Sequence, residues 1–473
     1  MKFSRRDFIK CAAAAAGTAI LPSTRAYATG GHTLALRAGR VEQVVRSDGA
    51  TTAFWGFNGE VPGPLARFRK GDAVRVVVDN GLDVDTAVHW HGVRVPNAMD
   101  GVPYVTQDPL KPGGRFVYEF TLRDSGTFWY HPHQSSFEQV PRGLYGAFVI
   151  EEERPIEVDR ELVWVLSDVK LDEAGRQVED FGRILDFAND GRLGNQVLLN
   201  GKAAGAERAI EVRSGERIRL RLINAASARI FELGIAGHTM NVVAYDGQAV
   251  DPHVVDRLLL GPGMRTDVVI DFLHASGGSF AVTDGHRRSL GSVATFAYSQ
   301  SKPLRGKALA APMRLTPNEL PEPQLAKASD HYVMFQGGMR GAPVLGIVDG
   351  KPAKTHELME RHGLAWTMNY TAQHEHALMH EPFLYLRLGE HVRLRMINDT
   401  DYAHPMHLHG HFFRVLAVDG DAVVGRPWRD TVLMGPRQTV DVAFVADNPG
   451  DWMYHCHILD HAAGGMMGTI RVE

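Results

Sequence analysis

Four short motifs in this sequence each carry two histidines separated by one residue. They are HWH beginning at His89, HPH beginning at His131, HLH beginning at His407 and HCH beginning at His455. On a β-strand, residues i and i+2 point to the same side, so each pair presents two imidazoles in one direction. Neutral imidazole is a nitrogen ligand that suits copper, zinc and iron. The four pairs therefore predict a transition-metal site.

Two of the pairs recur at matching distances from an internal repeat. The segments 70–80, 214–224 and 388–398 (KGDAVRVVVDN, SGERIRLRLIN and LGEHVRLRMIN) each end in Asn, nine positions after a Gly. In the first and third copies, histidines follow that Asn by nine and eleven positions. The middle copy has Leu233 and Ile235 there. The outer copies are thus predicted to bind metal, and the middle copy is not.

The other two pairs obey a second spacing rule. They lie five and seven positions after Gly126 and Gly450, and the matching stretch of the middle copy has Thr283 and Gly285. A single His-x-His can be an accident of a core or a surface, but four pairs at repeat offsets argue against accident. Eight imidazoles exceed the needs of one metal. They predict a cluster of about three ions between the outer copies, with the middle copy as scaffold.

Cys456 lies between the histidines of the last motif and has a chemistry of its own. On a strand its sulfur points away from the side of the two flanking histidines. A soft thiolate with His404, His461 and a weak axial Met466 is the ligand set of a blue-copper electron-transfer site. Met466 can also be a packing residue, as its neighbour Met467 illustrates, but its ten-residue spacing from the cysteine favours a ligand. One strand would then connect two metal sites.

The residue pattern around these motifs predicts the elements that position them. Alternating Arg and aliphatic residues in the three repeats predict strands with one buried face. Runs of β-branched residues broken by Gly, Pro, Asn and Asp favour an all-β chain of sandwich domains. We expect domains at 29–153, 154–300 and 329–473, with the proline-rich segment 301–328 as the connection between the last two.

Charge and the N-terminal segment bear on partners and location. The chain has 473 residues, a formal net charge of −4 and a pI near 6.6, which give no electrostatic reason to expect nucleic acid or an anionic membrane as partner. Residues 1–28, with Arg5-Arg6 and an AYA site ending at Ala28, are typical of a signal peptide read by the twin-arginine export machinery. We therefore expect a periplasmic protein, with no stable membrane anchor.

Together the motifs HWHG, WYHPH, HPMHLHGH and HCHILDHAAGGMM resemble those of the three-domain multicopper oxidases, which include laccases and bacterial copper-efflux and copper-resistance oxidases. The resemblance covers nearly all of the chain after the signal peptide. It implies three cupredoxin-like Greek-key β-sandwich domains and four copper ions. The implied ligands are His404, Cys456, His461 and Met466 for type 1 copper, His89 and His407 for type 2, and His91, His131 and His457 with His133, His409 and His455 for the type 3 pair.

The reaction that this resemblance implies is four one-electron oxidations of a reductant at the type 1 site, coupled to reduction of dioxygen to water. It also places an acid for proton delivery at Asp100, although Asp100 can be a turn residue before Gly101. One position departs from some relatives. Ala462 replaces a glutamate that they carry after the last type 1 histidine, so a proton route through that carboxylate must differ here or be absent.

The reductant is left open by the sequence. Phenols, aromatic amines and Cu(I) all fit, and the stretch 331–380 is enriched in Met and His without a dense methionine repeat. This stretch can bind extra copper or can be ordinary surface and core. A non-enzymatic periplasmic copper-binding or copper-resistance protein is the alternative function, and copper nitrite reductase is disfavoured because that reaction needs no type 3 pair.

Overall fold

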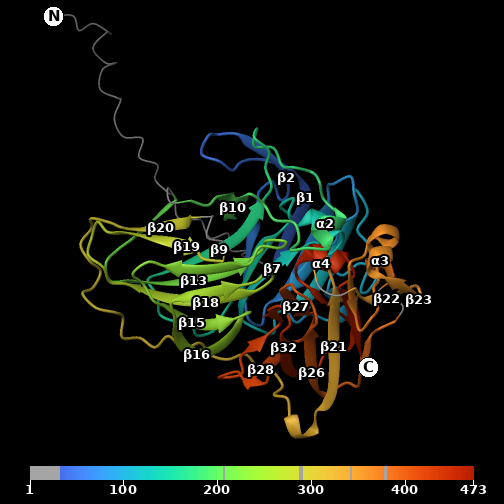
Figure 1. Ribbon diagram of the computed structural model, residues 1–473. Coiled ribbons are helices and arrows are strands. Elements are labelled where there is room, and N and C mark those ends of the chain that lie inside the picture. Colours follow the sequence, from blue (N-terminus) through green and yellow to red (C-terminus); the bar gives the residue numbers. More distant parts are fainter. Residues whose placement is uncertain (1–31, 206–207, 287–290, 341–342, 378–380) are drawn as a thin grey trace, which may run out of the picture.

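The computed structural model describes residues 32–205, 208–286, 291–340, 343–377 and 381–473. The expected signal peptide, residues 1–28, lies outside these ranges, as do residues 378–380 of the Met- and His-enriched stretch. The described chain is built mainly of β-strands arranged in three units, each with two principal sheets (Figure 1). The prediction of an all-β chain of three consecutive sandwiches is confirmed.

The first unit packs two four-stranded sheets around one core. Their orders are β2-β1-β4-β6 and β3-β8-β7-β5. Alternate residues of the strands, such as Val76 on β4 and Phe148 on β8, fill the space between the sheets. The strands are β1 (Thr33–Val44), β2 (Thr51–Phe57), β3 (Gly63–Arg69), β4 (Ala73–Asn80), β5 (His89–His91), β6 (Arg115–Thr121), β7 (Gly126–His131) and β8 (Gly146–Glu151).

The second unit pairs a seven-stranded sheet, β11-β10-β9-β13-β18-β15-β16, with a five-stranded sheet, β12-β20-β19-β14-β17. Leu233 and Ile235, which stand where the other units have histidines, are buried hydrophobic residues of this unit. The strands are β9 (Arg160–Val169), β10 (Gln196–Leu199), β11 (Lys202–Ala203), β12 (Ala209–Val212), β13 (Glu216–Asn224), β14 (Phe231–Ile235), β15 (Met240–Tyr245), β16 (Gln248–Val255), β17 (Arg257–Leu260), β18 (Arg265–Phe272), β19 (Ser279–Asp284) and β20 (Ser292–Tyr298).

The third unit has one sheet with the path β24-β21-β26-β32-β28-β29, to which β30 adds, and a second sheet β25-β34-β33-β27-β31. A hairpin of β22 and β23 lies beside them. The strands are β21 (Ser329–Gly337), β22 (Leu345–Val348), β23 (Lys351–Lys354), β24 (Trp366–Met368), β25 (Leu384–Leu386), β26 (His391–Asn398), β27 (His404–Leu408), β28 (Phe413–Val418), β29 (Asp421–Ala422), β30 (Trp428–Arg429), β31 (Thr431–Met434), β32 (Thr439–Val445), β33 (Gly450–Cys456) and β34 (Met467–Val472).

The three repeats occupy the same place in each unit. They form β4, β13 and β26, and each pairs in parallel with the first strand of its unit and antiparallel with a later one. The alternation of Arg and aliphatic residues therefore marks equivalent central strands. Equal offsets from these strands lead to equivalent positions in the three units, which is why the histidine spacing repeats.

Three of the short helices, α1, α2 and α4, lie where the units meet, and α3 packs on the β22–β23 hairpin of the third unit. In Figure 1 the second unit lies to one side, and α2 and α4 lie between it and the third unit. The helices are α1 (Ser136–Gln139), α2 (Ile184–Phe187), α3 (Thr355–His362) and α4 (Leu459–Ala463), with 3-10 turns η1 (Asn97–Met99), η2 (Leu325–Lys327) and η3 (Glu375–Ala377). Among the described residues, none of these helices has the length and apolar character needed to cross a membrane.

Candidate metal centres

The histidine pairs of each outer unit lie on neighbouring strands. In the first unit β5 pairs antiparallel with β7, which sets His89 opposite His131. In the third unit β27 pairs with β33, which sets His407 opposite His455. The same local geometry thus arises twice, from two parts of the chain more than 300 residues apart. Each outer unit presents four imidazoles from one sheet.

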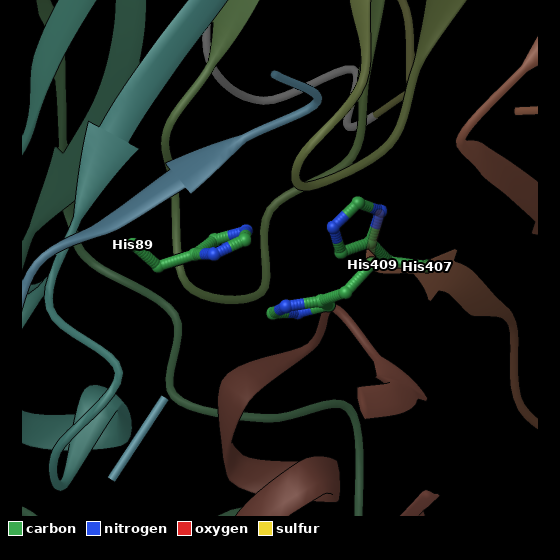
Figure 2. Close-up of side chains that lie close together, drawn as sticks. All are labelled: His89, His407 and His409. Atoms are coloured by element: carbon green, nitrogen blue, oxygen red, sulfur yellow. The ribbon is translucent and has the colours of Figure 1, made fainter. Parts of the chain in front are cut away.

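The two sets of four imidazoles face each other across the contact between the first and third units. The rings of His89 and His409 stack with centroids 3.9 Å apart, and those of His91 and His407 stack at 3.8 Å. Figure 2 shows His89 reaching from the first unit toward His407 and His409 of the third. All eight histidines are buried. The structure therefore brings the four predicted pairs into one cluster.

One nitrogen of several rings is fixed by a carbonyl of the protein. Nδ1 of His89 donates to the Asp100 carbonyl at 2.8 Å, Nδ1 of His407 donates to the Asp430 carbonyl at 2.9 Å, and Nδ1 of His455 donates to the Cys456 carbonyl at 2.8 Å. A proton on Nδ1 leaves a lone pair on Nε2 of each neutral ring. Such anchoring of the second nitrogen is the usual arrangement around metal-binding histidines.

The opposite nitrogens have the environment expected of metal ligands. Nε2 of His89, His131 and His407 is buried without a hydrogen-bond partner. Nε2 of His455 lies 3.1 Å from Nε2 of His409 and 3.4 Å from Nε2 of His133. Orphaned lone pairs that converge in a dry interior are costly unless a cation binds them. The donor set therefore fits copper.

Burial favours the neutral form of most imidazoles of this cluster, and of His404. Desolvation is the largest cause that lowers the pKa of the rings, and the neighbouring imidazoles lower it further. The affected histidines with a pKa well below the ordinary value are His91, His131, His133, His404, His409, His455 and His457. The neutral form is the one that binds a metal.

Cys456 lies at a second, smaller group of ligands. Its Sγ is 3.6 Å from Nδ1 of His404 and 3.7 Å from Nδ1 of His461, and these two nitrogens are 3.0 Å apart. Nε2 of His461 donates to the Asn189 carbonyl at 2.6 Å, and Nε2 of His404 lies 2.8 Å from the Thr400 hydroxyl oxygen. The free nitrogens and the sulfur therefore point at one another.

The remaining predicted ligand of this group, Met466, is fully buried, and its carbonyl accepts from the Cys456 amide at 3.0 Å. Burial raises the pKa of the Cys456 thiol. A buried thiol becomes a thiolate when a metal ion replaces its proton. The group matches the thiolate and two imidazoles that hold blue copper.

Two buried carboxylates touch the histidine cluster. Oδ2 of Asp100 lies 2.8 Å from Nδ1 of His409, so this residue of the HGVRVPNAMDG segment does more than form a turn. Oδ1 of Asp430 lies 3.4 Å from Nε2 of His91 and 3.6 Å from Nδ1 of His407. The sequence motifs did not single out Asp430, because it belongs to no histidine motif.

Asn189 and Thr431 were also missed from the sequence. Asn189 follows α2 in the second unit and covers the edge of His461, whereas the Thr431 hydroxyl lies 3.2 Å from Nε2 of His91 and 3.1 Å from Nδ1 of His407. Asn189 lies in irregular chain after α2, and Thr431 begins β31, which carries no histidine motif. Ala462 lies on α4 and packs among apolar residues such as Val102.

Comparison with known proteins agrees with this geometry. Family models described as multicopper oxidase match residues 40–155, 169–301 and 349–473. The multicopper oxidase MmcO of Mycobacterium tuberculosis is 32% identical over 441 residues, which cover 87% of this chain and 81% of that protein. Copper resistance protein A of Pseudomonas syringae pv. tomato is 28% identical, with 99% of each chain covered.

A solved structure gives the same result for the fold. The crystal structure of a multi-copper oxidase from Pseudomonas thermotolerans superposes with a TM-score of 0.81 at 32% sequence identity, and the match covers 94% of this chain and 100% of that one. The expected resemblance is confirmed, and copper is the cofactor of this chain. This chain belongs to the multicopper oxidase family and is a copper-dependent oxidase.

Proposed function

We propose that this oxidase takes electrons one at a time from a small organic reductant, a phenol or an aromatic amine, and delivers them to dioxygen. Copper bound at the two centres supplies the one-electron oxidations and the four-electron reduction of dioxygen to two waters. The proposed ligands are His404, Cys456, His461 and Met466 for type 1 copper, His89 and His407 for type 2, and His91, His131, His457, His133, His409 and His455 for the type 3 pair.

One observation carries this proposal. On β33 and the residue after it, the sulfur of Cys456 faces His404 and His461, while the adjacent His455 and His457 face the histidine cluster. Electrons that enter at the sulfur therefore have a route of a few covalent bonds to the site of oxygen reduction. The buried walls of both groups exclude water from that route.

Asp100 is the acid that we propose for proton delivery. Its carboxylate is buried at the junction of the outer units and contacts Nδ1 of His409. A carboxylate in this place can hold a proton beside the oxygen-reducing site. Ala462 offers no carboxylate, so the glutamate route of some relatives is absent.

The choice of an organic reductant is supported by a pocket that hydrogen bonds connect to His461 by way of Tyr402 and Asn189. It has a volume of about 430 Å³ and is lined by residues that include Arg340, Leu345, Ile347 and Tyr370. The Arg340 amide donates to the Tyr402 hydroxyl, which in turn donates to Oδ1 of Asn189 at 3.1 Å. Apolar residues alternate in this lining with Gln336, Asn369, Asp399 and Arg437, and such a mixed lining suits a small aromatic molecule that carries a polar group.

Cu(I) is the second candidate reductant, because a relative is named copper resistance protein A. A cuprous site needs soft ligands. Met339 offers one thioether beside the same loop, since its sulfur accepts from Nδ2 of Asn189 at 3.2 Å. Both candidate reductants would therefore bind beside the same loop. One experiment can show which of them the protein oxidises.

The domain limits and the location are part of the same proposal. We place the domains at 29–153, 154–300 and 329–473, with 301–328 as a linker, in agreement with the strand-free stretch between β20 and β21. Residues 1–28 direct export by the twin-arginine machinery to the periplasm, where copper and reductant are met.

The test measures oxygen uptake by the copper-loaded protein with a phenol and, separately, with Cu(I). We expect uptake with the phenol, and Tyr370→Ala to raise its KM by about 2–10-fold with kcat unchanged, because one aromatic contact in the pocket is lost. Tyr385→Ala is the matched control, since Tyr385 has similar exposure but lies outside this pocket.

Each other outcome selects a different function. Uptake with Cu(I) alone, lowered by Met339→Leu and untouched by Tyr370→Ala, would identify a cuprous oxidase. A preparation that contains its full copper complement but consumes no oxygen with either reductant would favour a copper-binding protein.

A further inference from the structure

Arg265 brings a buried positive charge from the second unit to the histidine cluster of the other two. It is the first residue of β18, and its side chain is fully buried. Its Nε donates to the Thr127 carbonyl of the first unit at 3.2 Å, and its Nη2 donates to the Asp246 carbonyl of its own unit at 3.1 Å. All three units thus meet at one guanidinium.

The main partner of Arg265 is Asp430 of the third unit. Nη1 donates to Oδ1 at 2.7 Å and Nη2 donates to Oδ2 at 2.5 Å, a bidentate pair in the dry interior. The two parallel hydrogen bonds fix the position and orientation of the Asp430 carboxylate.

Asp430, held in place by Arg265, contacts the imidazoles of His407 and His91. Its Oδ1 accepts from the Thr431 hydroxyl at 2.8 Å, and its carbonyl accepts from Nδ1 of His407 at 2.9 Å. The same Oδ1 lies 3.4 Å from Nε2 of His91. Hydrogen bonds to the far nitrogen fix which nitrogen of a ring faces a metal. The chain of contacts runs from Arg265 through Asp430 to His407 and His91.

Two glycines show how closely this arrangement is packed. A Cβ on Gly92, directly after the HWH motif, would lie 2.3 Å from Nη2 of Arg265 and 2.6 Å from Oδ2 of Asp430. A Cβ on Gly263, in the loop before β18, would lie 2.7 Å from the ring of His457. The second unit therefore packs against the cluster at two places. Arg265 lies against Gly92 and Asp430, and Gly263 lies against the ring of His457.

We propose that Arg265 is a positioning residue of the type 2 copper site, acting through Asp430 on the orientation of His407. The inference rests on the proposed ligand assignment. It gives the second unit, which has none of the histidine pairs, a direct share in the oxygen-reducing centre. The guanidinium supplies charge and a rigid two-pronged geometry, which Lys cannot reproduce.

The test compares Arg265→Met with the wild type as purified copper-loaded protein. Removing the guanidinium leaves Asp430 buried without its cation, so the carboxylate must protonate or move. We expect a roughly 10–100-fold weaker hold on the type 2 ion. On dialysis against a chelator, the variant should lose its type 2 electron paramagnetic resonance signal first, while its blue absorption per chain stays at the wild-type level.

Arg217→Met is the matched control. Arg217 is a buried arginine of the same unit that pairs bidentately with Asp271, away from the histidines. It should lower stability without selective loss of type 2 copper. Arg265→Lys, which keeps the charge, covers the case in which Arg265→Met does not fold, and it should show the same selective loss to a smaller degree.

Two results would overturn the inference. Parallel loss of blue absorption and type 2 signal would show that Arg265 only stabilises the fold, as would retention of type 2 copper equal to that of the wild type in Arg265→Lys and Arg265→Met. A wild-type protein that itself lacks a type 2 signal when fully loaded would instead contradict the ligand assignment.

Discussion

At the residue scale, Cys456 lies between two histidines of the buried cluster and beside the second group of candidate ligands, His404 and His461. Its thiol is buried beside two imidazole nitrogens, and burial raises its pKa, so its thiolate form requires a neighbouring cation. It is the free cysteine of the described chain. A reactive thiol is thereby kept away from solvent.

Cys456→Ser should abolish the intense blue absorption while leaving the fold intact. The hydroxyl has nearly the same volume but is a hard, neutral group that does not replace a thiolate. The proposed type 2 ligands, His89 and His407, are not changed by this substitution, so the type 2 resonance signal should remain. Visible absorption and circular dichroism check this, and persistent blue colour in the variant would reject the type 1 assignment.

The sequence predicts the histidines and the cysteine because they stand at fixed offsets from a repeat. It does not predict Asp430, Thr431 or Asn189, each of which contacts a proposed ligand of another unit: Asp430 and Thr431 contact His91, and Asn189 contacts His461. Their roles depend on how separate parts of the chain pack. The spacing of residues along the sequence does not predict that packing.

At the element scale, the Asn that ends each repeat has the same structural task in all three units. Nδ2 of Asn224 donates to the carbonyls of Arg229 and Leu260, and its Oδ1 accepts from the Ala226 amide at 3.0 Å. Asn80 and Asn398 make the same kinds of bond: each donates to one carbonyl in the loop that follows and to one carbonyl farther along the chain, and accepts from the amide two positions on. Each fixes the loop that follows the central strand.

Asn224→Ala should destabilise the second unit without loss of copper. Three buried hydrogen bonds are removed, and at about 1 kcal/mol each the cost is about 3 kcal/mol. Calorimetry should show a lower transition midpoint with unchanged copper content. Asn241→Ala removes one bond from β15 of the same unit and should lower the midpoint less. Equal shifts in the two variants would contradict this role.

The central strands could be predicted from alternation, and the structure has them at β4, β13 and β26. The segment from α2 to Asn189 could not, because four helical residues followed by irregular chain leave no periodic signal. Yet this segment covers His461 and closes one side of the type 1 site. The environment of His461 therefore depends on a segment for which the hydrophobic periodicity predicts no element.

At the scale of the whole molecule, buried charges join the units. Glu152, at the end of the first unit, forms ion pairs with Arg219 and Arg221 of β13, and Asp267 of β18 pairs with the same two arginines. Burial would raise the pKa of Glu152, but the two guanidinium groups prevail and lower it to about 2.

This shift makes the joint between the units sensitive to acid. The folded pKa of about 2 lies below the unfolded value of about 4.3, so Glu152 adds about 3 kcal/mol above pH 5. That contribution disappears as the pH falls through 2. Glu152→Gln should therefore lower the thermal midpoint clearly at pH 7 and hardly at all near pH 2.

The matched control is Asp83→Asn, which removes an exposed carboxylate paired with Arg40. It should leave the midpoint unchanged across the same pH range. A difference between Glu152→Gln and the wild type that stays constant from pH 7 to pH 2 would show that this carboxylate is not a fixed anion in the folded protein.

The repeat offsets predicted that the first and third units meet, because the eight imidazoles can share a metal cluster only if the two units face each other. They did not predict that the second unit reaches the same cluster through Arg265 and Gly263. Nothing in the β18 strand pattern separates Arg265 from the other arginines of this unit. Only its neighbours in the folded chain do.

The most direct measurement is an anomalous scattering map at the copper absorption edge, recorded from crystals of the loaded protein. We predict one peak between Cys456, His404 and His461, and three peaks enclosed by the eight paired histidines. The account would be contradicted if crystals that diffract well showed no copper peak among these histidines. It would also be contradicted if the copper peaks lay elsewhere on the chain.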